Sequence, residues 1–572
     1  MSEQTAIDVD FVIVGSGGGA LAAAIRAHDL GLNTLVVEKS AVYGGSTAMS
    51  GGGVWIPNNH LMAAAGVEDS DTEAFAYLKH ITKDQVAYNR LRAYVEHGKR
   101  AIEYLEKKAG LRLRSLPKYI DYYPDAPGAK PGGRTLEPRR FNTLKLGKER
   151  KKLRASHPQT LSMGYLHMTA LEAYWAVRGG FPGRLPIIWR LVLHWLNLPA
   201  RLIDRRSLQV TLGNAVIAPL RHAMLERNIP LWLNTAARSL VINNMHVSGI
   251  VAERDGQEVT INSKHGVLLA CGGFDHNQQM REQYLPMPNR HEWCAGNPDN
   301  TGDGILMGQA TGARLELMDD AWWTPVTRVP GEDLAWILVY EKNMPHSCML
   351  NTKGERITNE AGPYIDVVND MYFSSNRQER KFPHWMILDS RFRQQFAIGH
   401  VLPSGMMPDK KVPEAYWDNY LYKADTLEAL CKKTGIDVER ATQSIERFNQ
   451  FCETGQDKDF GRGQSEHDHY YSPKTDSPNP NLGSIKEAPF YAIPLYPGDL
   501  GTKGGLLTNE KAQVLRGDDS VIEGLYACGN CSSAVMGNSY AGAGSTIGPS
   551  IVFGFIAAES AASASGKANS ST

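Results

Sequence analysis

The sequence has no excess of charge of either sign, few cysteines and no basic-then-apolar pattern at its start. Lysine plus arginine and aspartate plus glutamate both number 61, so charge gives no case for a nucleic-acid partner. The seven cysteines are odd in number and scattered, which favours reduced thiols over a disulfide framework. Residues 1–8 lack the layout of a signal peptide, so we expect a cytoplasmic protein.

Metal ligands are also sparse. Cys528 and Cys531 form a C-x-x-C pair, but they lie in an Ala-Cys-Gly-Asn-Cys-Ser loop that has another use below; a redox or zinc role is the alternative. His467 and His469 stand close together in a polar stretch without further ligands. We expect both imidazoles to be solvated, and we predict no metal site.

A glycine-rich turn near the start carries the strongest positive signal. The β-branched run 11–14 enters Gly15-x-Gly17-x-x-Ala20, a helix-forming stretch follows, and a second apolar run ends at Glu38. Glycines at this spacing let the backbone approach a pyrophosphate at the helix N-terminus, and the acid can accept hydrogen bonds from a ribose. The pattern predicts a Rossmann-like α/β fold that binds a dinucleotide. A glycine turn that binds nothing would leave Glu38 unexplained.

A second glycine-rich loop follows at 43–53, Tyr-Gly-Gly-Ser-Thr-Ala-Met-Ser-Gly-Gly-Gly. Small hydroxyl residues between glycines suit a loop that lies against a flat ring. The segment resembles the one that wraps the flavin in the flavoprotein superfamily containing fumarate reductases, which implies FAD as the cofactor. Members that attach the flavin covalently place a histidine hereabouts. None occurs between Lys39 and Asn59, so we expect non-covalent FAD.

The same resemblance extends to the C-terminus, through Gly266–Gly273, Asn300–Ile305, Asp499–Gly505, Gly524–Asn530 and Tyr540–Gly548. The last of these stretches is expected to begin the final helix, with its amides directed at the flavin. The implied FAD contacts are Gly15, Gly17, Gly18, Gly19, Ala20, Glu38, Lys39, Gly44, Gly45, Ser46, Gly52, Gly273, Asp303, Gly529, Asn530, Gly544 and Ile547.

At 572 residues the chain is too long for a single core. The resemblance implies an FAD-binding domain formed by residues 1–320 and 490–572. An α+β substrate domain is expected at 321–489, inserted between these two parts.

Residues 145–206 are expected to form an insertion within the first part. Its segment 174–206 is rich in Trp, Leu and Ile, too short and too interrupted to span a bilayer. Arginines flank the apolar part, at positions 178, 184, 201, 205 and 206. This combination favours an element lying in the lipid headgroup layer at the inner face of the cell membrane. The alternative is a helical hairpin buried in a dimer interface or in the core.

Four stretches together narrow the resemblance to the 3-ketosteroid Δ1-dehydrogenases: 15–20, Asp-Tyr-Tyr at 121–123, 499–505 and 524–530. Two departures from the fumarate-reductase pattern agree with this. Tyr364 stands where those enzymes place an arginine that delivers a proton to a dicarboxylate, and Asn530 stands where many relatives carry an acid. An active site without that guanidinium is expected to take a neutral substrate.

The resemblance also assigns roles to the phenols. The Tyr540 hydroxyl and the Gly544 amide would bind the ring ketone, whose developing charge needs stabilisation. Tyr364 would take a proton from carbon 2 while a hydride leaves carbon 1 for flavin N5. Tyr122 would act as the proton relay, with Tyr119 and Tyr123 as competitors for that role. Because an ordinary phenol has a pKa of about 10, activity should rise at alkaline pH.

The expected partners are a hydrophobic 3-ketosteroid, such as cholest-4-en-3-one, and a quinone or artificial electron acceptor. The nearest alternative is an enzyme that introduces the Δ4 bond into 5α-steroids. A reductase of a conjugated acid is disfavoured because the arginine is missing. The alternative outside the enzymes is a membrane-bound carrier of steroid or flavin that does not turn over.

Overall fold

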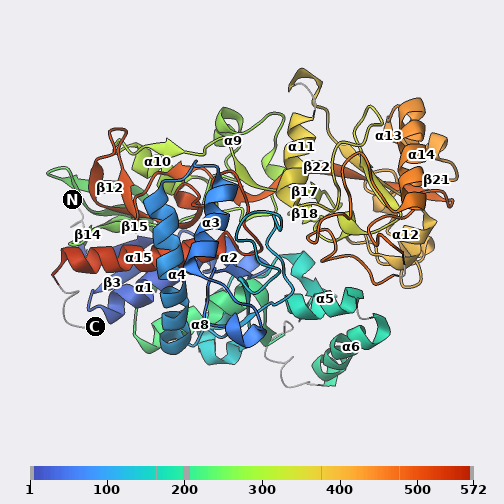
Figure 1. Ribbon diagram of the computed structural model, residues 1–572. Coiled ribbons are helices and arrows are strands. Elements are labelled where there is room, and N and C mark those ends of the chain that lie inside the picture. The colour runs from blue at the N-terminus through green and yellow to red at the C-terminus, as the bar shows by residue number, and fades with distance from the viewer. Residues whose placement is uncertain are drawn as a thin grey trace.

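The computed structural model describes residues 6–566 except 163, 179, 197–206, 375–376 and 476. Its elements form two lobes (Figure 1). One lobe contains both ends of the described chain, and the other contains the middle of the sequence from α11 (Tyr364–Phe373) to β21 (Tyr422–Ala424). This arrangement fits the predicted α/β domain that is interrupted by an inserted domain.

The first lobe is built on a six-stranded sheet in the order β11-β3-β2-β15-β25-β24. All neighbouring strands are parallel except β24, and Val12 of β2 lies between Leu35 of β3 and Val267 of β15. The strands span Phe11–Val14 (β2), Thr34–Val37 (β3), Leu231–Trp232 (β11), Val267–Leu269 (β15), Gln513–Leu515 (β24) and Val521–Ala527 (β25).

Every residue of β2, β3 and β15 is buried, as expected for parallel strands covered on both faces. Helices α1 (Gly18–Asp29) and α15 (Ile547–Ala564) pack on each other beside this sheet. They approach at glycines, since a Cβ added to Gly19 would lie 2.3 Å from the Ser550 carbonyl oxygen. α15 is long and apolar enough to cross a membrane, but 67% of it is buried in this core.

Further elements complete the first lobe. A second sheet has the order β1-β14-β13-β12, and a three-stranded sheet has the order β4-β6-β5. These strands are Ile7–Val9 (β1), Val54–Trp55 (β4), Leu113–Ser115 (β5), Thr135–Pro138 (β6), Thr235–Asn243 (β12), His246–Arg254 (β13) and Gln257–Ser263 (β14). The helices are Gly45–Met49 (α2), Asp71–Thr82 (α3), Tyr88–Ala109 (α4), Leu212–Glu226 (α8), Gln278–Tyr284 (α9) and Asp303–Gln309 (α10).

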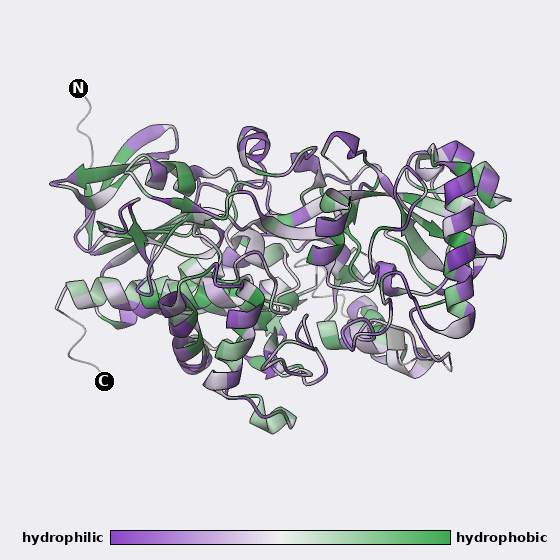
Figure 2. Cartoon of the chain, turned by 45° about the horizontal axis from the view of Figure 1, so that its top comes forward, coloured by the Kyte–Doolittle hydropathy of each residue, from purple (hydrophilic) through white to green (hydrophobic). Residues whose placement is uncertain are grey.

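The second lobe contains an antiparallel sheet in the order β18-β17-β22-β20-β19, to which β21 adds. β17 (Ala321–Thr327) and β22 (Phe490–Thr502) are its two long strands, and they begin where the sequence predicted the two domain boundaries. The other strands are Trp336–Ile337 (β18), Ser347–Leu350 (β19) and His384–Leu388 (β20), and the outer helices are Ser390–Gln395 (α12), Leu427–Thr434 (α13) and Val438–Thr454 (α14). Figure 2 shows α14 as largely hydrophilic, on the outside of this lobe.

The expected insertion contains α5 (Ala170–Arg178) and α6 (Gly180–Leu196), which in Figure 1 lie below the second lobe, to the right of the lower part of the first. Residues 197–206, with three of the predicted flanking arginines, are outside the described part of the chain. Within α5 and α6, apolar side chains are exposed by 41–71%: Trp175, Leu185, Ile188, Trp189, Val192, Leu193, Trp195 and Leu196. The hairpin is therefore not buried in the core of this chain.

Candidate active site

One cavity of about 450 Å³ extends from the glycine turn after β2 to the phenols near the second lobe. Most of the residues predicted to contact FAD line it. They are Gly15, Gly17, Glu38, Lys39, Gly45, Ser46, Gly52, Asp303, Gly529, Asn530, Gly544 and Ile547. The positions come from loops after β2, β3 and β25 and from the start of α15, so the carboxyl ends of the parallel strands open onto the cavity.

The other five predicted contacts, Gly18, Gly19, Ala20, Gly44 and Gly273, lie behind the cavity wall. Their small size serves packing. A Cβ on Gly273 would lie 2.2 Å from Thr502 Oγ1, and one on Gly44 would lie 2.7 Å from the Ala48 side chain. These glycines hold the cavity wall in place without facing the cavity.

The acid at the end of β3 occupies the place that a ribose-binding group needs. Glu38 is buried, and its carboxylate accepts hydrogen bonds from Ser16 Oγ at 2.6 Å and from the Ser40 amide at 2.9 Å. Burial raises the pKa of Glu38. Beside it, Lys39 Nζ contacts Asp303 Oδ2 at 2.7 Å, so two predicted FAD contacts pair with each other.

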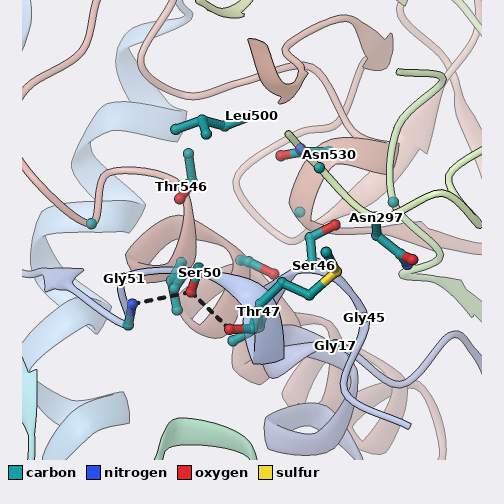
Figure 3. A pocket seen from close by; sticks show the side chains of 18 of the residues that line it. Gly17, Gly45, Ser46, Thr47, Ser50, Gly51, Asn297, Leu500, Asn530 and Thr546 are labelled. Atoms are coloured by element: carbon teal, nitrogen blue, oxygen red, sulfur yellow. Dashed lines mark hydrogen bonds between the residues drawn. The ribbon is translucent and has the colours of Figure 1, made fainter. Parts of the chain in front are cut away.

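Figure 3 shows the cavity between the glycine- and serine-rich loop and the C-terminal segments. Ser46 Oγ accepts a hydrogen bond from Asn300 at 2.9 Å, and Ser50 Oγ donates to the Thr47 carbonyl at 2.7 Å. Gly52 has φ +67°, and a Cβ there would lie 2.2 Å from the Leu212 carbonyl carbon. A glycine-lined wall with hydroxyls and backbone groups fits a flat ring with carbonyls and phosphates, so these residues are suited to hold FAD.

Three phenols meet at the other end of the cavity. The ring centroids of Tyr122, Tyr364 and Tyr540 are 5.2–5.4 Å apart, and the Tyr122 hydroxyl donates to the Tyr364 hydroxyl at 3.1 Å. All three side chains are buried and line the cavity. Tyr123 instead donates to Asp366 at 3.2 Å. Of the three tyrosines in 119–123, Tyr122 is thus the one bonded to Tyr364.

Gly544 lies next to Tyr540 in the cavity wall. Its φ is +100°, and a Cβ would come within 2.4 Å of the Gly53 carbonyl carbon, so only glycine fits here. Its carbonyl accepts a hydrogen bond from the Trp55 amide at 3.2 Å. In the described parts of the chain, no acceptor is hydrogen-bonded to the Gly544 amide. This N–H remains available to a bound ligand.

The sequence placed the start of the last helix too early. The stretch from Tyr540 to Gly544 is a turn, closed by the Ser545 hydroxyl between the amide and carbonyl of Gly542 (3.0 and 2.7 Å), and α15 begins only at Ile547. The left-handed conformation of Gly544 is incompatible with a helix. Tyr540 therefore projects from the turn before the helix.

The loop that carries Tyr122 is fixed by a buried carboxylate. Asp121 accepts hydrogen bonds from the Trp55 indole at 2.9 Å, the Arg134 guanidinium at 2.8 Å and the Lys130 amide at 3.0 Å. Burial raises the pKa of Asp121 to about 6. The Tyr122 amide also donates to the Ala541 carbonyl at 3.1 Å, which joins this loop to the turn that carries Tyr540.

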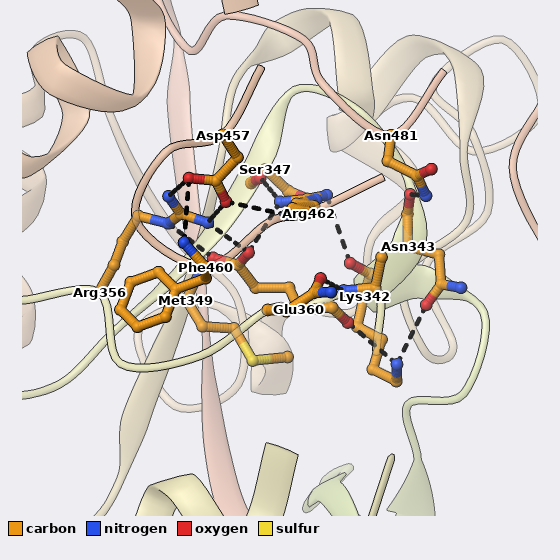
Figure 4. Close-up of polar contacts among 12 residues, drawn as sticks. Lys342, Asn343, Ser347, Met349, Arg356, Glu360, Asp457, Phe460, Arg462 and Asn481 are labelled. Carbon is orange, nitrogen blue, oxygen red and sulfur yellow. Dashed lines mark hydrogen bonds and ion pairs between the residues drawn. The ribbon is translucent and has the colours of Figure 1, made fainter. Parts of the chain in front are cut away.

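Tyr364 is the first residue of α11, and a buried ionic cluster fixes the turn before it (Figure 4). Lys342 Nζ donates to the carbonyls of Glu360 and Gly362 at 2.9 and 2.5 Å. The Glu360 carboxylate accepts from Arg356 at 2.8 Å and lies 3.3 Å from Arg462. Burial raises the pKa of Glu360, but the two guanidinium groups outweigh this, so the net shift is downward.

The structure adds Tyr471, which the sequence did not single out, and it gives Tyr119 and His467 new surroundings. The Tyr119 hydroxyl lies 2.6 Å from that of Tyr471, and both rings line the cavity. His467, which we expected to be solvated, is buried, and its ring packs against Tyr122 with centroids 5.0 Å apart. His467 and Tyr471 lie about 350 positions after Tyr119 in the chain, so no local sequence pattern predicts these contacts.

The walls around the phenol end are largely apolar. They include Leu116, Met168, Ala170, Ala173, Ile337 and Val339. No arginine lines the cavity within the described residues. This agrees with the predicted loss of a guanidinium clamp and suits an uncharged, hydrophobic ligand.

Burial keeps the phenols protonated at neutral pH. It raises the pKa of Tyr364 and Tyr122 well above their usual range. The neighbouring Tyr540 raises the pKa of both further, whereas the hydrogen bond from Tyr122 partly lowers that of Tyr364. Burial also raises the pKa of Tyr540. A neutral Tyr540 can donate a hydrogen bond, whereas Tyr364 can act as a base only after it has lost its proton.

Comparisons with known proteins agree with this site. The FAD binding domain family matches residues 10–547. A 3-oxosteroid 1-dehydrogenase of Mycolicibacterium smegmatis is 42% identical, over 98% of both chains. The crystal structure of the 3-ketosteroid Δ1-dehydrogenase of Sterolibacterium denitrificans, in complex with 1,4-androstadiene-3,17-dione, matches with a TM-score of 0.94 and 45% identity, over 97% of this chain and all of that chain.

The 3-ketosteroid-Δ4-(5α)-dehydrogenase of Rhodococcus jostii has a TM-score of 0.66 at 20% identity, over 97% of both chains, and thus shares the fold alone. The full-length similarity and the family match lead to one conclusion: the chain is an FAD-binding flavoprotein and belongs to the family of the 3-oxosteroid 1-dehydrogenases.

Proposed function

We propose that the protein desaturates the bond between carbons 1 and 2 of a neutral 3-ketosteroid. The observation that carries this proposal is the group of three buried phenols beside the free Gly544 amide, at an apolar end of the FAD cavity without arginine. The relatives' activity and the steroid bound to the Sterolibacterium enzyme support the same reaction here.

The ketone oxygen would bind between the Tyr540 hydroxyl and the Gly544 amide. Both are donors, and they would stabilise the negative charge that develops on this oxygen as carbon 2 loses its proton. Glycine at 544 leaves the amide open to the ligand. Bound FAD supplies the hydride acceptor.

Tyr364 would take the carbon 2 proton through its phenolate oxygen. Its hydroxyl is 3.1 Å from that of Tyr122, which can pass the proton on. Tyr119 and Tyr471, with hydroxyls 2.6 Å apart, form a second pair of phenols in the cavity wall. This arrangement supports a relay, because each hydroxyl can donate to one neighbour and accept from another.

Anaerobic mixing with androst-4-ene-3,17-dione tests this proposal. We expect the flavin absorbance to bleach and the 1,4-diene to form in one equivalent. A 5α-3-ketone that yields only the Δ4 product would support the sister enzyme instead. Bound steroid with unchanged flavin would support a carrier. Parallel product analysis with cholest-4-en-3-one would establish whether a steroid with its side chain is a substrate.

We further propose that α5 and α6 contact a membrane surface from which the steroid is taken. Ala170 and Ala173 of α5 line the cavity, while the apolar side chains of α6 are exposed. Arg140 and Arg190 both pair with Glu172, at 2.5 and 2.9 Å, and tie α6 to α5 and to the body. Exposed tryptophans and leucines on such a helix suit the headgroup layer.

Deletion of 174–206 should abolish pelleting with vesicles of anionic phospholipid, while the full chain pellets. Sedimentation velocity on both proteins tests the alternative, a helical hairpin at a dimer interface. In that case the deletion would convert a dimer to a monomer. Equal vesicle binding by both proteins would contradict the membrane proposal without affecting the assigned reaction.

A further inference from the structure

Trp322 lies behind the cavity, between the residues proposed for the flavin and those proposed for the steroid. It is the second residue of β17 and is 3% exposed. Its indole N–H donates to Asn530 Oδ1 at 3.2 Å, and its ring meets that of Tyr540 edge to face, with centroids 5.0 Å apart. One side chain thus contacts a cavity-lining amide and the phenol proposed to bind the ketone.

The indole can only donate, so the oxygen of the Asn530 amide must face it. The amide nitrogen then points the other way, where a Cβ on Gly501 would be 2.5 Å from it. Asn530 and Leu500 lie near each other in the cavity wall in Figure 3. Without the indole, either the oxygen or the nitrogen of the Asn530 amide could face the FAD cavity.

The indole itself is held by a buried ion pair. Lys503 Nζ lies 5.0 Å from the centroid of the Trp322 ring and 2.9 Å from Asp320 Oδ2, and the Lys503 side chain is fully buried. An ammonium over an indole face is attractive, most of all where water is excluded. Lys503 therefore fixes the plane of the ring that contacts Tyr540 and Asn530.

We propose that Trp322 is a positioning residue that orients the Asn530 amide toward FAD and the Tyr540 phenol toward the steroid ketone. The orientation of Asn530 toward FAD, the flavin half of the proposal, depends only on the FAD cavity. The orientation of Tyr540 toward the ketone, the steroid half, rests on the proposed function. The two halves can be measured separately, because the first needs no steroid.

The chain offers a matched control in the next residue. Trp323 is also buried, at 2% exposure, and its indole donates to Asp320 at 2.7 Å. Its ring packs on Tyr372, whereas that of Trp322 packs on Tyr540. Trp323→Phe therefore removes an equivalent buried indole N–H without touching Asn530 or Tyr540. Its partner is Oδ1 of Asp320, so the pair of Lys503 with Oδ2 remains.

Trp322→Phe keeps a ring against Tyr540 and Lys503 but loses the N–H. We expect its Kd for FAD to rise about 3- to 10-fold and the visible bands of the bound flavin to shift, whereas W323F keeps the wild-type Kd and spectrum. Trp322→Leu also loses the ring, so it should in addition weaken binding of 1,4-androstadiene-3,17-dione by about 3- to 10-fold.

A double-mutant cycle closes the test. Asn530→Ala should weaken FAD binding by itself, and W322F should add nothing in that background. Wild-type FAD affinity in W322F or in N530A would overturn the flavin half, and the N530A result decides even if W322F does not fold. Wild-type steroid affinity in W322L would overturn the other half. A wild-type enzyme that binds steroid but forms no diene would contradict the proposed function and leave the flavin half intact.

Discussion

At the scale of single residues, the three central phenols differ in their surroundings. Tyr540 projects from a turn beside a free amide, Tyr364 begins a helix held by buried charges, and Tyr122 packs on both and bonds to Tyr364. Their chemistry is the same, so the backbone that carries each one must give it its role. Sequence similarity suggests the three roles, ketone binding, proton abstraction and proton relay, and the different surroundings of the three phenols are consistent with them.

Replacement of Tyr364 or Tyr540 by Phe should remove turnover while FAD stays bound. Loss of a base or of an oxyanion donor lowers the rate by about 10²- to 10⁴-fold. Single-turnover kinetics and the flavin spectrum measure the two properties separately. Tyr123→Phe is the control, because this phenol bonds to Asp366 and not to the other two. Full turnover in both Y364F and Y540F would clear these residues of catalysis.

The rate should rise with pH, because burial raises the pKa of Tyr364 well above 10. Below that pKa, the ionised fraction of a base grows about tenfold for each pH unit. We expect log kcat/KM to increase with a slope near one between pH 7 and 9.5, measured with a saturating electron acceptor. A flat profile over this range would show that Tyr364 is not the group that must ionise.

At the scale of elements, short apolar patterns in the sequence predicted strands correctly. They did not predict contacts between residues far apart in the chain. The run 11–14 is β2 at the predicted bounds, because a parallel strand buried on both faces is apolar throughout. The same reasoning failed at Tyr540, where Gly544 delays the helix, and at His467, which looks polar in sequence and packs on Tyr122. Both errors concern backbone conformation or partners that lie far away in the chain.

The turn before α11 should depend strongly on its buried charges. Glu360→Gln leaves Arg356 and Arg462 facing a neutral amide, and removal of one partner from a buried ion pair costs about 3–5 kcal/mol. Urea unfolding of the FAD-loaded protein measures this loss. Glu428→Gln is the control, since Glu428 pairs with Lys432 on the exposed surface of α13 and should unfold like the wild type. Equal unfolding of E360Q and wild type would contradict the importance of the cluster.

At the scale of the whole molecule, the site is assembled from both lobes. Tyr122 and Tyr540 come from the FAD lobe, and Tyr364 comes from the inserted lobe. β17 and β22 begin at the predicted domain boundaries and join the lobes, and Trp322 lies on the first of these strands. The domain boundaries at 321 and 490 stay a prediction. The contacts between the lobes could not be predicted from the sequence, because each contact depends on residues from both lobes.

The number of buried phenols also predicts how the whole protein responds to alkali. Burial raises the pKa of six of them well above 10, namely Tyr77, Tyr94, Tyr119, Tyr122, Tyr364 and Tyr471, and it raises the pKa of other buried tyrosines as well. Above pH 10 the unfolded chain loses these protons while the folded chain keeps them, so the unfolded state binds fewer protons and stability falls as pH rises. Each phenol then contributes about 1.4 kcal/mol of loss per pH unit.

Two buried lysines oppose this trend only at lower pH. Burial lowers the pKa of Lys342 to about 7 and also lowers that of Lys503. These two groups therefore make the folded protein more stable as pH rises, but only up to the pKa of a lysine in the unfolded chain, about 10.4. The Tm should therefore fall steeply between pH 10.5 and 11.5. Tyr471→Phe removes one of these phenols and should make this fall measurably shallower. If the Tm is constant over this range, or Y471F falls as steeply as wild type, these phenols do not keep their protons in the folded protein.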